Sequence, residues 1–123
     1  MARILVADDD SNLRAVLRLT LEHAGHHVVE AADGREAMAR VRESEIDLVV
    51  TDMLMPEMDG LEAIQKLRAL RPGIRIIGIS GGGRIDAKNY LTLAAKLGAA
   101  RVLTKPFPMQ DLVAAVAETL AAP

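Results

Sequence analysis

Four of the five apolar segments in this chain end in side chains suited to binding metal or phosphate. Aspartates follow the first segment and end the third, a serine ends the fourth and a lysine follows the fifth: Asp8, Asp9, Asp52, Ser80 and Lys105. If these side chains meet, the carboxylates repel one another unless a cation binds among them. Carboxylate oxygens without histidine or cysteine suit Mg²⁺, which keeps several waters and bridges carboxylates to a phosphoryl group. The lysine adds a compact positive charge suited to a phosphate oxygen.

The run Asp8-Asp9-Asp10 also has a simple structural explanation. Asp10 or Ser11 could cap the helix that follows, where acidic side chains are favoured by the helix dipole. Three aspartates exceed what one cap requires. Asp52 taken alone is equally well interpreted as a solvated loop carboxylate. The choice therefore depends on the elements that bring these residues together.

Short apolar strands and amphipathic helices alternate along the chain. The expected strands are Ile4–Ala7, His27–Ala31, a run around Val49, Ile74–Ile79 and Arg101–Thr104. The expected helices bury Leu13, Val16, Leu17, Leu21 and Ala24, then Ala37, Met38 and Val41, and then span about 59–70, 86–97 and 109–121. Glycine is typical of helix ends, so we expect Gly25 to stop the first helix.

Five β-α units in strict alternation predict an α/β fold, in which a doubly wound parallel sheet carries helices on both faces. We expect the strand order 2-1-3-4-5, which places strands one, three, four and five side by side. Their carboxyl ends then share the edge at which ligands bind in open sheets of this kind. A length of 123 residues predicts one domain over residues 1–123.

Four motifs in this order make the chain resemble the receiver domain of two-component response regulators. They are L-V-A-D-D at Leu5–Asp9, D-M-L-M-P-E-M-D-G at Asp52–Gly60, the serine at position 80, and G-A-x-x-V-L-T-K-P-F at Gly98–Phe107. The resemblance covers the whole chain and implies a (βα)5 flavodoxin-like fold. It implies a phosphoacceptor in a phosphorelay, which is a signalling switch rather than an enzyme. The implied partners are a histidine kinase or phosphotransfer protein and a downstream effector protein or effector domain.

The resemblance also implies a role for each carboxylate. Asp52 is implied as the nucleophile that takes the phosphoryl group from a phosphohistidine, giving an aspartyl phosphate. Asp9 and Asp52 are implied as direct Mg²⁺ ligands together with the carbonyl of Leu54. Asp8 is implied as a metal-binding residue that acts through water.

The remaining implied roles belong to the lysine and the serine. Lys105 would pair with the phosphoryl group, and Ser80 would close on it after transfer. The Lys105-Pro106 peptide bond is expected to be cis, as the resemblance implies.

Two positions depart from the usual pattern of the family and concern the signalling step. Val102 stands where an aromatic residue is common, and Gly81 stands where alanine is common. Valine is short and stiff at χ1, so it cannot make the inward swing ascribed to the aromatic residue. Our hypothesis is that the loop Gly81–Arg84 reorders instead, because its three glycines permit large backbone changes.

The composition argues against several other classes of protein. The net charge is −2 with scattered basic residues, and Tyr90 and Phe107 are the only aromatic residues, so nucleic acid binding is not expected. The absence of cysteine excludes disulfides and cysteine-based zinc sites. No signal-peptide pattern and no apolar run of about 18 residues occur, so we expect a cytoplasmic protein without a membrane partner.

Other motifs have weaker interpretations. The segment Gly78–Gly82 fits G-x-S-x-G of α/β-hydrolases, but that fold needs a histidine after the serine, and all three histidines precede Ser80. Those histidines lack the i, i+4 spacing of a helical zinc pair, and the glycine run lacks the G-K-[ST] ending of a phosphate-binding loop. The methionines at 53, 55 and 58 fit a partner surface and packing about equally well.

Two questions remain open from the sequence. A receiver-like interaction module that is never phosphorylated would share the fold, although the complete set of site residues argues against it. The chain ends directly after the last expected helix, so it is either a receiver that acts alone or part of a longer protein.

Overall fold

The structure is a computed structural model that describes residues 2–52, 60–80 and 101–122. Its strands are β1 (Arg3–Ala7), β2 (His27–Ala31), β3 (Leu48–Asp52), β4 (Arg75–Ser80) and β5 (Arg101–Thr104). Its helices are α1 (Ser11–His23), α2 (Gly34–Glu43), α3 (Gly60–Leu70) and α5 (Met109–Ala121). The helix predicted over 86–97 and the hypothesis about the Gly81–Arg84 loop lie outside the described residues.

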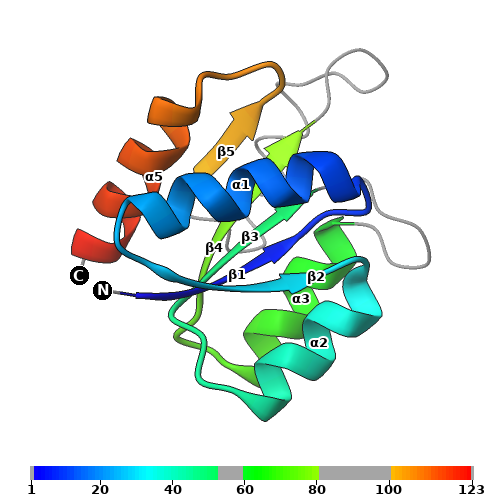
Figure 1. Ribbon diagram of the computed structural model, residues 1–123. Helices are drawn as coiled ribbons and strands as arrows, with labels where there is room; N and C mark the ends of the chain where they lie inside the picture. The colour runs from blue at the N-terminus through cyan, green and yellow to red at the C-terminus, as the bar shows by residue number, and fades with distance from the viewer. Residues whose placement is uncertain (1, 53–59, 81–100, 123) are drawn as a thin grey trace.

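The five strands form one parallel sheet in the order β2-β1-β3-β4-β5, which confirms the predicted topology (Figure 1). The register pairs Ala7 with Thr51, Asp52 with Ile79, and Ser80 with Thr104. All strands run in one direction, so their carboxyl ends lie along the same edge of the sheet. The sheet therefore brings the ends of β1, β3, β4 and β5 together in one row.

Helices cover both faces of the sheet, with α1 and α5 on one side and α2 and α3 on the other (Figure 1). Successive strand residues point to opposite faces, so each strand feeds two apolar layers. One layer contains Ile4, Val6, Leu17, Leu21, Val50, Ile77, Leu112 and Val116. The other contains Leu5, Ala37, Met38, Val41, Val49, Ile64, Leu67 and Ile76. Burial on both faces explains the apolar runs within β1, β3 and β4, whereas the edge strands β2 and β5 are less buried and more polar.

Aspartate side chains cap the starts of α1 and α2. Asp10 is the N-cap of α1, and its Oδ1 accepts hydrogen bonds from the backbone N–H groups of Asn12 (3.0 Å) and Leu13 (3.2 Å). Asp33 caps α2 in the same way, through the N–H of Glu36 at 2.8 Å. Of the three consecutive aspartates, Asp10 therefore caps α1, and the cap does not account for Asp8 and Asp9.

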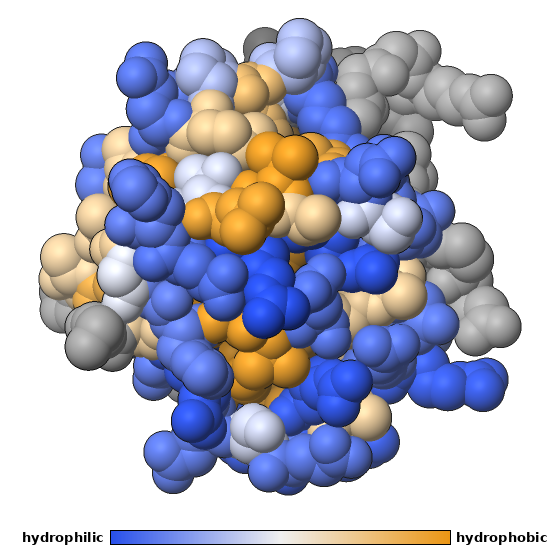
Figure 2. Space-filling view, in the orientation of Figure 1, coloured by the Kyte–Doolittle hydropathy of each residue, from blue (hydrophilic) through white to orange (hydrophobic). Residues whose placement is uncertain are grey.

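The apolar stripe of α1 differs from the prediction. Leu17 and Leu21 are buried as expected, but Val16, which was expected to be buried, is 46% exposed. Leu19, which was not part of the predicted stripe, is 65% exposed. Consecutive helical residues differ by about 100° around the axis, so Val16 lies beside the buried stripe rather than within it. Ala24 is also exposed, because it follows the last helical residue. Figure 2 shows apolar side chains over this helix, bordered by hydrophilic ones.

None of the helices within the described ranges has both the length and the apolar character needed to cross a membrane.

The end of α1 depends on the backbone freedom of one glycine. Gly25 has φ of 97°, its N–H donates to the carbonyl of Glu22, and the N–H of His26 donates to the carbonyl of Leu21. This pair of bonds is a Schellman motif, which needs a left-handed residue at the Gly25 position. Gly25 therefore stops the helix, as the sequence predicted.

We expect Gly25→Ala to lower the free energy of unfolding by about 1 kcal/mol, because a side chain at positive φ strains the backbone. The space around an added Cβ is open at Gly25 and equally open at Gly73, so packing does not confound the comparison. Gly73→Ala is the control and should leave stability unchanged or slightly higher. Urea unfolding of both variants measures the difference, and equal stabilities would contradict the strain at Gly25.

Candidate functional site

An acidic cluster lies at the carboxyl edge of the sheet. Asp8 and Asp9 follow β1, and Asp52 is the last residue of β3. One carboxylate oxygen from each lies within 4.8 Å of the other two. Asp8 and Asp52 are buried, whereas Asp9 is exposed. The topology thus brings together the three aspartates that the sequence selected.

Lys105 adds an amine to the acidic cluster. Its Nζ lies 3.3 Å from Oδ2 of Asp52 and 3.9 Å from Oδ2 of Asp8, and its side chain is 31% exposed. The backbone N–H of Lys105 donates to the carbonyl of Ser80 at 2.8 Å, directly beyond the β4–β5 pairing. The Lys105-Pro106 peptide bond is cis, as expected. The amine therefore reaches into the cluster from the end of β5.

Ser80 ends β4 at the same edge and is buried, with 9% of its surface exposed. Ile79 pairs with Asp52, so Ser80 stands one position beyond the aspartate on the neighbouring strand. The fold therefore brings Ser80 to the same edge of the sheet as the three aspartates and Lys105. Leu54, the remaining predicted site residue, lies outside the described part of the chain.

Burial raises the pKa of the Asp8 carboxyl from its ordinary 3.8 to about 6. The negative charges of Asp52 and Asp9 add to this rise, whereas the hydrogen bond from the Asp10 amide and the charge of Lys105 oppose it, and the pKa of about 6 is the net result. The Asp10 N–H donates to Asp8 Oδ1 at 2.8 Å. The carboxyl of Asp8 is thus held where its ionised form is disfavoured by the low local polarity and by its acidic neighbours.

The donor atoms of the cluster fit a hard divalent cation. Within the described residues, Asp8 Oδ2 is buried and has no hydrogen-bond partner, although a buried carboxylate oxygen normally has one. The carboxylates of Asp9 and Asp52 lie within reach of the same point. A set of oxygen ligands suits Mg²⁺. Water molecules bound to Mg²⁺ can also donate a hydrogen bond to a carboxylate oxygen that has no other partner, such as Asp8 Oδ2.

Arg14 contacts the acidic cluster, although the sequence did not predict it as a site residue. Nη1 of Arg14 donates to the backbone carbonyl of Asp8 at 2.7 Å, and Nε of Arg14 donates to Glu30 at 2.9 Å. A signal for this contact exists, because Arg14, Leu17 and Leu21 are spaced at i, i+3 and i+7 and share the inward face of α1. A charged residue on an apolar stripe usually has a partner beneath it.

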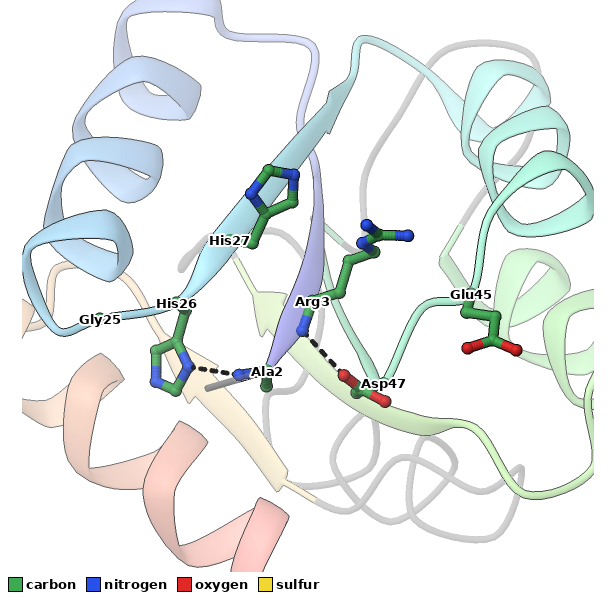
Figure 3. A pocket seen from close by; sticks show the side chains of 7 residues that line it. All are labelled: Ala2, Arg3, Gly25, His26, His27, Glu45 and Asp47. Atoms are coloured by element: carbon green, nitrogen blue, oxygen red, sulfur yellow. Dashed lines mark hydrogen bonds between the residues drawn. The ribbon is translucent and has the colours of Figure 1, made fainter.

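A separate hollow of about 500 Å³ lies at the opposite edge of the sheet (Figure 3). Residues at the starts of β1 and β2 and just before β3 line it, including Arg3, His27 and Asp47. Figure 3 shows two bonds there, from the Ala2 N–H to Nδ1 of His26 at 3.3 Å and from the Arg3 N–H to Asp47 at 2.8 Å. These groups tie the strand starts together and lie away from the acidic cluster.

Residues 4–117 match the family described as the response regulator receiver domain. The chain belongs to this family. It is 38% identical over 122 residues to the response regulator receiver protein CpdR of Brucella abortus, with 99% of each chain covered. A receiver domain structure from Clostridium thermocellum superimposes with a TM-score of 0.89 at 34% identity, covering 98% of this chain and 94% of the other. The receiver interpretation drawn from the four motifs is therefore confirmed.

Relatives of this receiver domain differ in length. The DNA-binding transcriptional regulator NtrC of Azospirillum brasilense is 38% identical over 97% of this chain, which spans only 24% of that protein. The receiver domain thus occurs in relatives of about its own length and in much longer ones. It is the receiver domain of a signalling switch, of the response regulator type.

The burial of Asp8 predicts a pH dependence of stability in the absence of metal. Its pKa in the folded protein, about 6, lies above the ordinary 3.8, so ionisation disfavours the folded state. The free energy of unfolding should fall by up to about 3 kcal/mol as the pH rises from about 4 to about 6, and then level off. Urea unfolding in EDTA at several pH values measures this decline.

Asp8→Asn should lack this decline, and in EDTA it should be more stable than the wild type at pH 7. Asp47→Asn removes an exposed carboxylate at the opposite edge of the sheet and serves as the control that keeps the decline. A wild-type profile in Asp8→Asn would show that Asp8 is not the titrating group.

Proposed function

We propose that Asp52 is the phosphoryl acceptor of this receiver domain. The main support for this proposal is the position of the Asp52 carboxylate at the end of the central strand. It is buried and lies beside two further aspartates and a lysine amine. A buried carboxylate with this many charged neighbours is typical of a reactive site. Ligands of doubly wound sheets bind at this edge, beyond the carboxyl ends of the strands.

The transfer step needs positioning and charge neutralisation more than acid–base catalysis. A carboxylate oxygen of Asp52 attacks the phosphorus of a phosphohistidine in line with the phosphorus–nitrogen bond. The new oxygen–phosphorus bond forms as that bond breaks, and the histidine nitrogen leaves with the electron pair. Lys105 pairs with an oxygen of the transferred group, and the distance of 3.3 Å from its amine to Asp52 supports this role.

Asp9 and Asp52 are proposed as the direct protein ligands of Mg²⁺, with Asp8 contributing through water. A bound Mg²⁺ would neutralise negative charge on the phosphoryl oxygens and on the carboxylates. Three carboxylates with one amine leave an excess of negative charge in the cluster, so this chain's own residues favour a cation there. The proposed ligand role of the Leu54 carbonyl rests on the family resemblance.

Ser80 is proposed to donate its hydroxyl to a phosphoryl oxygen after transfer, and the resulting movement would change the surface offered to a partner. The proposed donor is a histidine kinase or phosphotransfer protein, and the proposed target is an effector protein or an effector domain. Hydrolysis of the aspartyl phosphate by water at the same site would end the signal. The cytoplasmic location and the single domain over 1–123 stay predictions.

The alternative is a receiver-like interaction module that phosphorylation does not regulate. A module of this kind has no need for an acidic cluster with a lysine amine beside it, because crowded like charges lower stability without a cation. The presence of all five side chains at one edge of the sheet therefore favours the phosphoacceptor function.

Asp52→Asn should abolish phosphoryl uptake from acetyl phosphate in the presence of Mg²⁺, because an amide is nearly isosteric with a carboxylate but cannot form the acyl phosphate. Intact-protein mass spectrometry follows the uptake, and circular dichroism establishes that the variant is folded. Asp47→Asn, at the far edge of the sheet, should be phosphorylated like the wild type. Uptake by Asp52→Asn, or none by the folded wild type, would overturn the proposal.

A further inference from the structure

Asp8 follows the last residue of β1, where the acidic cluster begins, and both its backbone N–H and its carbonyl are hydrogen-bonded. Its N–H donates to the carbonyl of Ala31 at 3.1 Å, which extends the β1–β2 pairing by one step. Its carbonyl accepts Nη1 of Arg14 at 2.7 Å. Backbone groups at a strand end need such partners, because the ladder no longer supplies them.

Arg14 connects this carbonyl to the neighbouring strand. Nε of the same guanidinium donates to Oε1 of Glu30 at 2.9 Å, and Glu30 belongs to β2. The Arg14 side chain is 18% exposed, so the bridge is largely shielded from water. The donors of a guanidinium point in fixed directions within one plane, so both bonds together fix where the Asp8 carbonyl lies.

The carbonyl and the carboxylate of Asp8 belong to one residue, so fixing the first restricts the second. Asp8 Oδ1 is engaged by the Asp10 N–H, and the buried Oδ2 faces the cluster, 3.9 Å from Lys105 Nζ. We expect a shift of the Asp8 backbone to displace its carboxylate relative to the carboxylates of Asp9 and Asp52. Groups that orient metal-binding residues affect metal affinity strongly even without touching the metal.

We propose that Arg14 is a positioning residue for magnesium, which acts by anchoring Asp8 to Glu30 of β2. The inference rests on the proposed function, because it concerns the same acidic cluster. The inference gives a basic side chain a favourable effect on Mg²⁺ affinity, whereas its charge alone would lower that affinity.

A purely electrostatic role for Arg14 predicts the opposite sign. A positive charge near a cation site repels the cation, so removing it should strengthen Mg²⁺ binding. Removing a positioning contact should weaken binding. The direction of the change in affinity therefore separates the two roles.

The test is calorimetric titration of Mg²⁺ into the wild type and three variants. We expect Arg14→Ala to bind Mg²⁺ about tenfold more weakly. Arg14→Lys keeps the charge but cannot make both bonds, so its affinity should fall as well. Arg18→Ala is the matched control, because Arg18 lies one turn further along α1, binds the other oxygen of Glu30 at 2.7 Å and also pairs with Glu22. Its affinity should stay close to that of the wild type.

The second link, from Arg14 to Glu30, is tested by a double-mutant cycle. If Glu30 acts through Arg14, Glu30→Ala should weaken Mg²⁺ binding, and the double variant should be no worse than Arg14→Ala. Phosphoryl uptake provides a further readout. Arg14→Ala should need more Mg²⁺ for half-maximal uptake, yet approach the wild-type rate at saturating Mg²⁺. If Arg14→Ala fails to fold by circular dichroism, Arg14→Lys carries the same test.

Unchanged or tighter Mg²⁺ binding in the folded Arg14 variants would overturn the inference, as would an equal loss in Arg18→Ala. If the wild type binds Mg²⁺ and is phosphorylated while Arg14→Ala behaves like it, only the inference fails. If the wild type neither binds Mg²⁺ nor takes up a phosphoryl group, the proposed function fails and the inference falls with it.

Discussion

The repulsion among buried carboxylates is the constraint on which the rest of this structure depends. Asp8 and Asp52 are buried beside each other, and Asp9 lies within reach of both. Lys105 offsets only part of that charge. Such an arrangement lowers stability unless a cation binds among the carboxylates. The same excess of negative charge favours the binding of a divalent cation at this edge of the sheet.

The fold holds this unfavourable cluster in place through the pairing of apolar strands. Parallel pairing of β1 with β3 sets Ala7 beside Thr51, so the aspartates that follow emerge next to each other. The β3–β4 and β4–β5 pairings bring Ser80 and Lys105 to the same edge. Two apolar layers, one under α1 and α5 and one under α2 and α3, fix the sheet from both faces. Burial of these layers supplies the free energy that opposes the repulsion at the edge.

The sequence was sufficient to predict the topology and to predict which polar residues meet at the carboxyl edge of the sheet, because both follow from where the apolar segments end. Strict alternation of strands and helices leaves few topologies, and the strand order then decides which ends meet. Details that depend on side-chain direction were not accessible. The exposure of Val16 depends on how α1 is rotated about its axis, and the bridge from Arg14 to Asp8 depends on a rotamer and on the separation of α1 from β2. Periodicity marks the faces of a helix but does not identify the partner beneath each side chain.

We propose that one carboxylate, that of Asp52, accepts the phosphoryl group. Borohydride reduces an aspartyl phosphate to homoserine, so peptide mapping after treatment with acetyl phosphate, Mg²⁺ and borohydride locates the modified residue. We expect conversion at Asp52 alone, and only when both the phosphodonor and Mg²⁺ are present. Conversion at Asp8 or Asp9, or a stable phosphate ester on Ser80 with Asp52 unchanged, would contradict it.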